Sequence, residues 1–168
     1  KNYHKNKTIH CQLKGIRLIT IFSDELDNVD RLKHRLQYLM GTMPRLAHAR
    51  DCIIKCVPFK VIAEFLDNYH IQGKVASSIN VAAYYNNDLV GTMTFGNLRK
   101  SLGSSKHDGV YELIRFCSKG NIPGLANKLL TSFVRQYNPQ KIVTYSDNRW
   151  NTGNVYKKMG FELVCETQ

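Results

Sequence analysis

The sequence predicts an α/β fold in which helices flank a mixed, twisted sheet. An apolar segment at 111–117 precedes a loop with glycine and proline, a helix-spaced stretch at 125–137 and a short strand at 141–145. A further short helix follows, so this part of the chain is predicted to be a β-α-β-α unit. The apolar stretches 79–85 and 89–95 flank a turn-forming asparagine pair, which predicts a β-hairpin in the same sheet.

Residues 1–41 are predicted to form a short strand-and-helix appendage. A helix with a basic, polar face ends at Gly15, and the apolar stretch 16–22 that follows is predicted to be a strand. Asp24 and Glu25 come next, and we interpret them as a solvated cluster at the start of a helix.

A second helix of the appendage is predicted between Asn28 and Gly41. Asn28 or Asp30 is suited to cap its first turn, and Gly41 is suited to end it. The apolar stripe of this helix consists of Val29, Leu32, Leu36 and Leu39.

Residues 42–49 are predicted to be a linker, because Pro44 interrupts any continuing helix. The main domain, 50–168, then opens with a strand at 52–57 and a helix at 59–69 before it reaches the hairpin. The predicted organisation is therefore an appendage, a linker and one α/β domain.

The loop that precedes the helix at 125–137 carries the first functional signal. Amides at the start of a helix attract anions, because they have no partner within the helix and the helix dipole favours negative charge there. The residues of interest are Asn121, Gly124, Leu125 and Ala126 in the loop, with Tyr156, Gly160 and Phe161 downstream. Together with the order of elements, they resemble the GNAT superfamily of N-acetyltransferases.

The GNAT resemblance implies a role for each group. In that family a Gln/Arg-x-x-Gly-x-Gly/Ala loop holds the pyrophosphate of acetyl-CoA, and a tyrosine before a Gly-Phe pair protonates the departing thiolate. Loop residues 121–126 would then bind the cofactor, Tyr156 would be the acid, and Glu112 would be the general base. Asn121 replaces the preferred Gln or Arg, and Pro123 lacks an N–H. The sequence therefore predicts that no cofactor is needed or that acetyl-CoA binds weakly.

The net charge carries the second signal. The chain has 24 Lys and Arg against 13 Asp and Glu, which gives +11. One interpretation is a polyanionic partner, double-stranded DNA, because each phosphate contact releases counterions. The other is a basic surface that only keeps the protein soluble. The residues expected to contact DNA are Arg31, Lys33, Arg35, His70, Gln72, Arg99, Lys100, Lys106 and Arg149.

The expected DNA contacts fall into two groups. The arginines and lysines are suited to backbone phosphates, whereas His70 and Gln72 are suited to base edges in a groove. His70 has an alternative role, which is to cap the carbonyls at the end of the helix 59–69. Trp150, next to Arg149, is expected to fill the core and not to stack on bases.

A second resemblance covers nearly the whole chain. Its motifs are Tyr-His-x-x-Lys-Thr at 3–8, Tyr-His-x-Gln-Gly at 69–73, Met-Thr-Phe-Gly at 93–96, the strand 111–117, Tyr-Ser-Asp-x-Arg-Trp at 145–150 and Gly-Asn-x-Tyr at 153–156. They are similar to phage-type homing endonucleases whose nuclease domain is related to the very-short-patch repair endonuclease. The resemblance implies that residues 1–41 are the carboxy-terminal remnant of a nuclease domain with a basic helix. It also implies that residues 50–168 are a GNAT-like domain that positions DNA.

In that family the metal-binding carboxylates precede the segment found here. No metal site is therefore expected in this chain, Mg²⁺ would act only with the missing nuclease part, and no cleavage is expected from this chain alone. No apolar run approaches the roughly 20 residues of a membrane span, and the five cysteines are an odd number. These features predict a cytoplasmic protein with reduced thiols and no membrane partner, within a bacterial host if phage-encoded.

Three functions remain open from the sequence. The main interpretation is a DNA-binding or positioning domain of a phage-type homing endonuclease that lacks the nuclease carboxylates. The alternatives are an acetyl-CoA-dependent N-acetyltransferase and a GNAT-like enzyme that modifies DNA bases. Fold resemblance alone does not decide between them, because one fold hosts unrelated functions.

Overall fold

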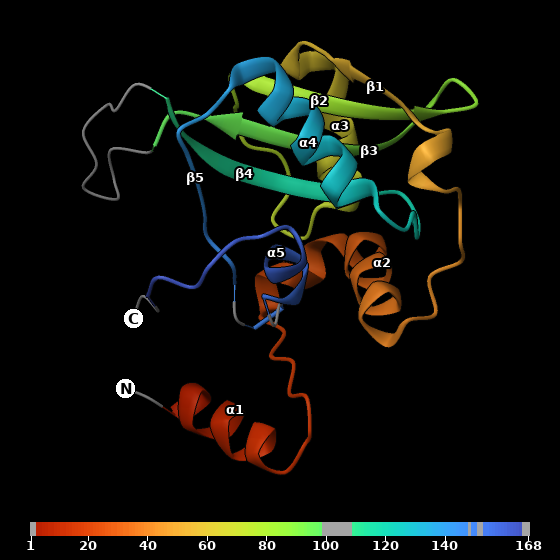
Figure 1. Cartoon of the computed structure of the whole chain (residues 1–168). Helices are drawn as coiled ribbons and strands as arrows, with labels where there is room; N and C mark the ends of the chain where they lie inside the picture. Colours follow the sequence, from red (N-terminus) through yellow and green to blue (C-terminus); the bar gives the residue numbers. More distant parts are fainter. Residues whose placement is uncertain (1–2, 99–108, 148, 151–152, 166–168) are drawn as a thin grey trace. The chain divides into compact units, whose positions relative to one another are not determined.

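The computed structural model describes residues 3–98, 109–147, 149–150 and 153–165 (Figure 1). In chain order the elements are α1 (Tyr3–Leu13), the 3₁₀ helix η1 (Ser23–Asn28), α2 (Val29–Met40), the 3₁₀ helix η2 (Ala49–Asp51), β1 (Ile53–Cys56), α3 (Phe59–Tyr69), β2 (Ile79–Tyr85), β3 (Asp88–Gly96), β4 (Val110–Ser118), α4 (Leu125–Tyr137), β5 (Lys141–Thr144) and α5 (Asn154–Lys158).

The chain divides into two compact units. One unit is Asn28–Tyr145, and the other joins the segment that ends at Asp27 with the segment that starts at Ser146. The first unit holds the sheet and the helices α2, α3 and α4. The predicted boundary between appendage and main domain at residues 42–49 stays a prediction.

The sheet has five strands in the order β1-β2-β3-β4-β5. The first four strands pair antiparallel with their neighbours, and β4 pairs parallel with β5. The predicted mixed sheet is confirmed, with 111–117 and 141–145 in the same sheet. The hairpin between β2 and β3 turns through Asn86 and Asn87, whose φ angles of 49° and 67° are the pair of positive values that a two-residue type I′ turn needs.

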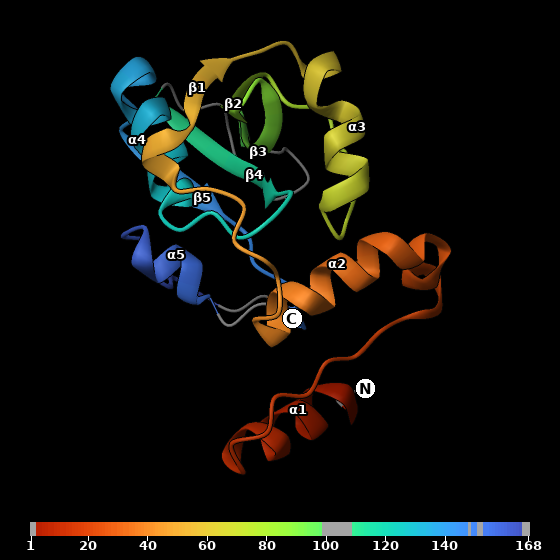
Figure 2. The same cartoon turned by 90° about the vertical axis from the view of Figure 1, so that its right-hand side faces the viewer.

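Helices cover both faces of the sheet, as Figure 2 shows for α3 and α4. On one face Ile62 and Leu66 of α3 are fully buried in a cluster with Ala82 of β2 and Cys117 of β4. On the other face Phe133 of α4 stacks on Phe95 of β3 with ring centroids 3.6 Å apart. Burial of apolar side chains on both faces is what holds this α/β unit together.

The predicted capping of α2 is confirmed. The Asn28 side chain accepts a hydrogen bond from the Arg31 amide at 3.0 Å. At the other end, Gly41 has a φ of 70°, and its N–H bonds to carbonyls of the last turn. The sequence thus defines both ends of this helix through local interactions.

The predicted strand at 16–22 does not form. Residues 16–22 have neither helix nor strand structure, and the side chains of Ile16 and Phe22 are exposed. A strand is stable only when a neighbour pairs with its backbone, and no such neighbour lies beside this stretch in the described part of the chain. Apolar composition alone therefore misled the prediction.

The smaller unit is joined by a cluster around Trp150. The indole Nε1–H donates to Glu25 at 2.8 Å, and the Arg17 guanidinium donates to the Trp150 carbonyl at 3.0 Å. Arg149 lies over the Phe22 ring, 4.6 Å from its centroid. Trp150 is completely buried, which confirms the predicted packing role. These contacts tie the chain before Asp27 to the chain after Ser146.

Glu25 corrects the expectation of a solvated cluster. Its side chain is only 12% exposed, and besides Trp150 it accepts a hydrogen bond from the Phe22 amide at 2.8 Å. It does begin a helix, the 3₁₀ helix η1, but its second partner comes from 125 residues further along the chain. A tertiary contact of this length has no local signal in the sequence.

We predict that Phe133→Ala lowers the free energy of unfolding by about 3–5 kcal/mol, because it removes a fully buried ring stacked on Phe95. The neighbouring residue Val134 is 39% exposed. The matched control Val134→Ala is expected to cost less than about 1 kcal/mol. Urea denaturation followed by circular dichroism measures both, and equal losses would contradict this description of the core.

Candidate functional site

β4 and β5 pair over only part of the length of β4. Their register runs from Val110 with Lys141 to Leu113 with Thr144, where the Thr144 hydroxyl donates to the Leu113 carbonyl at 3.1 Å. β4 then continues to Ser118, and beyond Leu113 no strand of the described chain pairs with it on that side. The parallel pairing therefore ends at Leu113 and Thr144, and β4 continues for five residues beyond it toward the loop before α4.

The loop that follows β4 leads directly into the N-terminus of α4. Gly124 precedes the helix with a φ of 83°, a conformation that side chains other than glycine disfavour. Leu125 N–H donates to the Ile122 carbonyl, and Lys128 N–H to the Gly124 carbonyl. In the described chain no backbone carbonyl accepts from the N–H groups of Gly124, Ala126 or Asn127. These amides form a mouth suited to an anion.

Backbone hydrogen bonds join residues of the predicted linker to this loop. The Asn121 N–H donates to the Pro44 carbonyl at 3.1 Å, and the Leu46 N–H donates back to the Asn121 carbonyl at 3.0 Å. The Ala49 N–H donates to the Pro123 carbonyl at 3.2 Å. The loop is thus fixed by backbone hydrogen bonds before any ligand arrives, which favours binding by reducing the ordering cost.

Lys128 strengthens this support from the first turns of α4. Its ammonium donates to the carbonyls of Ala49 at 2.8 Å and Cys52 at 2.7 Å, with Arg50 at 3.3 Å as a third acceptor. A charged donor shared by several carbonyls holds the segment around η2 against α4. Sequence reasoning missed Lys128, because nothing near it in the chain indicates a contact 76 residues away.

Helix α2 meets the same loop through His34. The Nε2–H of His34 donates to the Lys119 carbonyl at 3.1 Å, and the ring packs edge-on against Tyr69. Burial lowers the pKa of His34, with a further contribution from Arg35, against the Lys119 hydrogen bond that raises it. A neutral imidazole therefore joins α2 to the end of β4.

Four of the residues expected to contact DNA, Arg31, Arg35, His70 and Gln72, gather around the end of α3 and the turn that follows it. The Arg31 guanidinium donates to the Asp67 carbonyl at 3.4 Å, and Arg115 of β4 donates to the Gly73 carbonyl at 3.3 Å. Burial, and then the charges of Arg115, Arg35 and Arg31, lower the pKa of His70 to about 3. His70 is thus neutral, and its Nδ1 accepts the Gln72 amide proton at 3.2 Å.

The two roles considered for His70 have different outcomes. Its backbone N–H caps α3 by donating to the Leu66 carbonyl, whereas its ring organises the following turn and does not cap the helix carbonyls. Base readout by His70 and Gln72 stays a prediction, with Gln72 exposed. Lys33 is exposed and pairs with Asp30 at 3.9 Å.

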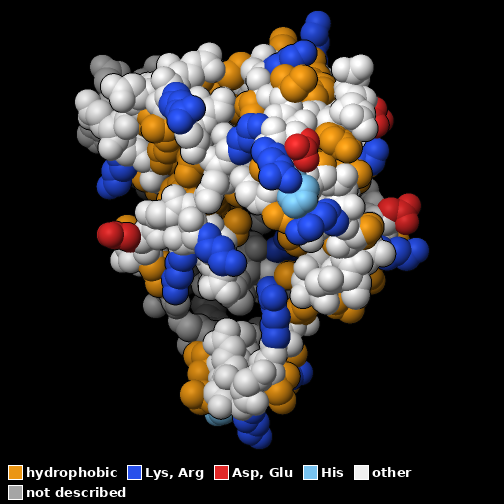
Figure 3. All heavy atoms as spheres, turned by 45° about the vertical axis from the view of Figure 1, so that its right-hand side comes forward, with side chains coloured by type: hydrophobic (Ala, Val, Ile, Leu, Met, Phe, Trp, Pro, Cys, Tyr) orange, Lys and Arg blue, Asp and Glu red, His pale blue; other side chains and the backbone are white. Residues whose placement is uncertain are grey.

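The remaining predicted residues lie in different surroundings. Arg99, Lys100 and Lys106 are outside the described residues. Arg149 belongs to the smaller unit, where Asp147 accepts from its guanidinium at 2.6 Å and raises its pKa. In the view of Figure 3, Lys and Arg side chains are more frequent than Asp and Glu side chains.

The two residues with a proposed catalytic role also lie in different units. Glu112 is 1% exposed within β4. Tyr156 is half-buried in α5 of the smaller unit, where its ring lies edge-on to Phe161 with centroids 5.9 Å apart. The Tyr and Gly-Phe motif therefore builds one local cluster, as its spacing suggests.

Other chemistry has little support among the described residues. They contain no group of three side chains that could hold a metal ion, and all five cysteines are free thiols. Each helix in the described ranges is too short or too polar to cross a bilayer.

Comparison with known proteins decides the fold. No family model matches the chain, and no curated protein sequence does either. Among solved structures, the aminoglycoside N-acetyltransferase AAC(6')-Iy in complex with CoA matches with a TM-score of 0.52 at 15% identity, over 69% of this chain and 96% of that one. The chain has the GNAT fold.

Two further GNAT-fold structures agree. An aminoglycoside acetyltransferase from an uncultured soil metagenomic sample has a TM-score of 0.51 at 14% identity, over 71% of this chain and 95% of its own. A GNAT family acetyltransferase of Streptococcus pneumoniae TIGR4 has a TM-score of 0.50 at 15% identity, over 70% and 95%. At such identities the likeness defines the fold of this chain and not its substrate.

We predict that His70 makes stability depend on pH. Because the pKa is lowered from 6.5 to about 3, the unfolded chain binds a proton that the folded chain excludes. The stabilisation is complete above pH 6.5 and is lost as pH falls toward 3, with a slope of up to about 1.4 kcal/mol per pH unit.

The variant His70→Asn tests this prediction, because its side-chain oxygen can still accept the Gln72 amide proton but does not titrate in this range. Urea unfolding between pH 7 and 5 should show a flatter dependence for the variant than for the wild type. His34 acts in the same direction, so some slope remains. Parallel curves for the two proteins would refute the assignment.

Proposed function

We propose that this chain is an acyl-CoA-dependent N-acyltransferase that binds the cofactor pyrophosphate at the mouth of α4. The observation that carries the proposal is the end of the parallel pairing of β4 with β5 before a rigid loop with available amides. This arrangement offers one strand edge and one helix N-terminus to a long, anionic ligand.

The residues present fit such a ligand. Gly124, Ala126 and Asn127 supply the backbone N–H groups, and α4 adds its dipole. Pro123 has no N–H and therefore supplies no donor. The Asn121 N–H donates to the Pro44 carbonyl, so it is not among the amides that would bind the ligand either. The mouth therefore depends on the helix amides more than on the residues in which the loop departs from the GNAT pattern.

The chemistry requires two proton transfers. When bound, an acyl-CoA supplies a thioester whose carbonyl carbon is attacked by an amine. We assign removal of the amine proton to the side chain of Glu112, directly or through water. The GNAT resemblance gives protonation of the leaving sulfur to Tyr156, which belongs to the smaller unit. Both assignments come from the GNAT resemblance. The fold shared with an acetyltransferase solved with CoA supports them.

A second proposal is that the chain binds and positions double-stranded DNA as part of a phage-type homing endonuclease. The net charge of +11 supports this function. The two proposals are compatible, because the amide mouth and the basic side chains are different features of the molecule. A GNAT-like enzyme that modifies DNA bases would need both.

We predict that Ala126→Glu weakens CoA binding without unfolding the protein. A carboxylate in the first turn of α4 interacts favourably with the helix dipole, but it repels the pyrophosphate that would bind at the same amides. Calorimetric titration with CoA should show affinity weakened by about tenfold or more, since a charge repulsion of about 1.4 kcal/mol has that effect.

The matched control is Thr131→Glu, which adds the same charge at an exposed position further along α4. Its affinity for CoA should stay within about twofold of the wild type, because exposed charges at this distance are largely screened by salt. If the wild type itself shows no heat of binding with CoA, the acyltransferase proposal is refuted and the sequence-based expectation of weak or absent binding stands.

A further inference from the structure

The amino-terminal helix has an unusual charge composition. The first acidic residue of the chain is Asp24, so the 23 residues before it carry basic groups only, among them Lys7 and Lys14. α1 lies within this stretch and extends over 11 residues, about 16 Å. With no carboxylate on or near the helix in sequence, its lysines have no local ion-pair partner such as the i+4 pairs that usually accompany exposed lysines.

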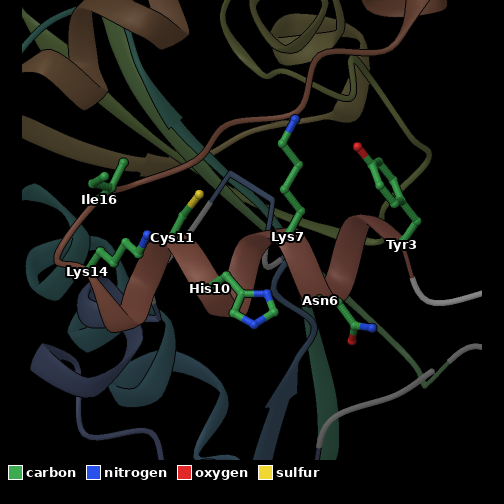
Figure 4. A pocket seen from close by; sticks show the side chains of 7 residues that line it. All are labelled: Tyr3, Asn6, Lys7, His10, Cys11, Lys14 and Ile16. Carbon is green, nitrogen blue, oxygen red and sulfur yellow. The ribbon is translucent and has the colours of Figure 1, made fainter.

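α1 also borders an open hollow of about 420 Å³ (Figure 4). The side chains that line it from the helix side are Tyr3, Asn6, Lys7, His10, Cys11 and Lys14. In Figure 4 Lys7 extends from the helix on the same side as Tyr3 and Cys11, whereas Asn6 and His10 lie on the neighbouring side. The hollow is thus bordered by two cations, Lys7 and Lys14, and by aromatic and amide groups from two neighbouring sides of the helix.

A membrane surface is a poor partner for this helix. Interfacial helices separate an apolar face from a basic face. Here Ile9 and Leu13 are exposed at 43% and 79%, but Tyr3 and Cys11 alternate with Lys7 on the side that borders the hollow. Inserting either side into the acyl region would bury polar or charged groups. A partner that offers both phosphates and flat apolar or hydrogen-bonding edges matches this mixture better.

We propose that α1 is the surface through which this chain contacts double-stranded DNA, with Lys7 and Lys14 on backbone phosphates and Asn6 at a base edge. The proposal rests on the second proposed function, DNA binding, and names its contact surface. A helix fits the major groove of B-DNA, which is about 12 Å wide, but not the deep, narrow major groove of A-form RNA. Asparagine is suited to pair with adenine there.

This surface differs from the basic residues that the sequence favoured. Arg31 is half-buried and donates to the Asp67 carbonyl, and Arg35 is half-buried near His70. Both would have to leave interactions within the protein before they could reach a phosphate. Lys7, in contrast, is exposed, and so is Lys14.

The test compares the full chain with two double variants. Lys7→Ala/Lys14→Ala removes the proposed phosphate contacts, and Lys157→Ala/Lys158→Ala removes two exposed lysines from α5 as the matched control. Fluorescence anisotropy with a 20-base-pair labelled duplex, about two turns of DNA, is measured from 50 to 200 mM salt. Far-ultraviolet circular dichroism and Trp150 emission confirm that each variant is folded. Double-stranded RNA and phosphatidylserine vesicles are the competing ligands.

We expect the α1 variant to bind DNA about tenfold more weakly at 100 mM salt, with a log–log salt slope reduced by about two units. The control should change affinity by less than about threefold. An equal loss in both variants would assign binding to net charge and overturn the role of α1. No binding by the wild type would overturn DNA binding itself, and preference for RNA or vesicles would replace the partner.

Discussion

The parallel pairing of β4 with β5 is the constraint on which the rest of this molecule depends. Because it stops at Leu113 and Thr144, no strand of the described chain pairs with the remaining five residues of β4 on that side, and these residues lead into the loop before α4. Antiparallel pairing with β3 continues along that same part of β4, so the strand stays fixed in the sheet up to the loop. The mixed sheet thus holds the loop and the N-terminus of α4 in a defined position.

Support for the loop comes from parts of the chain that are distant in sequence. The Pro44 and Ala49 region pairs with its backbone, Lys128 holds that region against α4, and His34 brings α2 to the Lys119 carbonyl. None of these contacts uses the amides at the start of α4, and those amides have no backbone acceptor in the described chain. The loop is therefore fixed in position while the amides at the start of α4 can still bind a ligand.

The basic residues of the described chain fall into two groups. Arg31 donates to the Asp67 carbonyl in the last turns of α3, and Arg115 donates to the Gly73 carbonyl after the helix. Arg149 contacts Asp147 and Phe22 within the smaller unit. Guanidinium groups are suited to such tasks because they offer several donors in fixed directions. Among the described residues, Lys7 of α1 and Lys14 just after it are exposed and hold no such contact, so they are the better candidates for an external polyanion.

The sequence by itself determined the regular elements of the larger unit, because their signals are local. The turn at Asn86 and Asn87, the caps at Asn28 and Gly41, and the apolar periods of α3 and α4 act within a few residues. Only the tertiary structure decided the fate of 16–22, the burial of Glu25 and the roles of Lys128 and His70. The environments of Glu25, Lys128 and His70 depend on groups brought close by folding, such as Trp150 for Glu25 and Arg115 for His70, and such separations leave no pattern in a single sequence. The stretch 16–22 stays irregular because no strand of the described chain pairs with it.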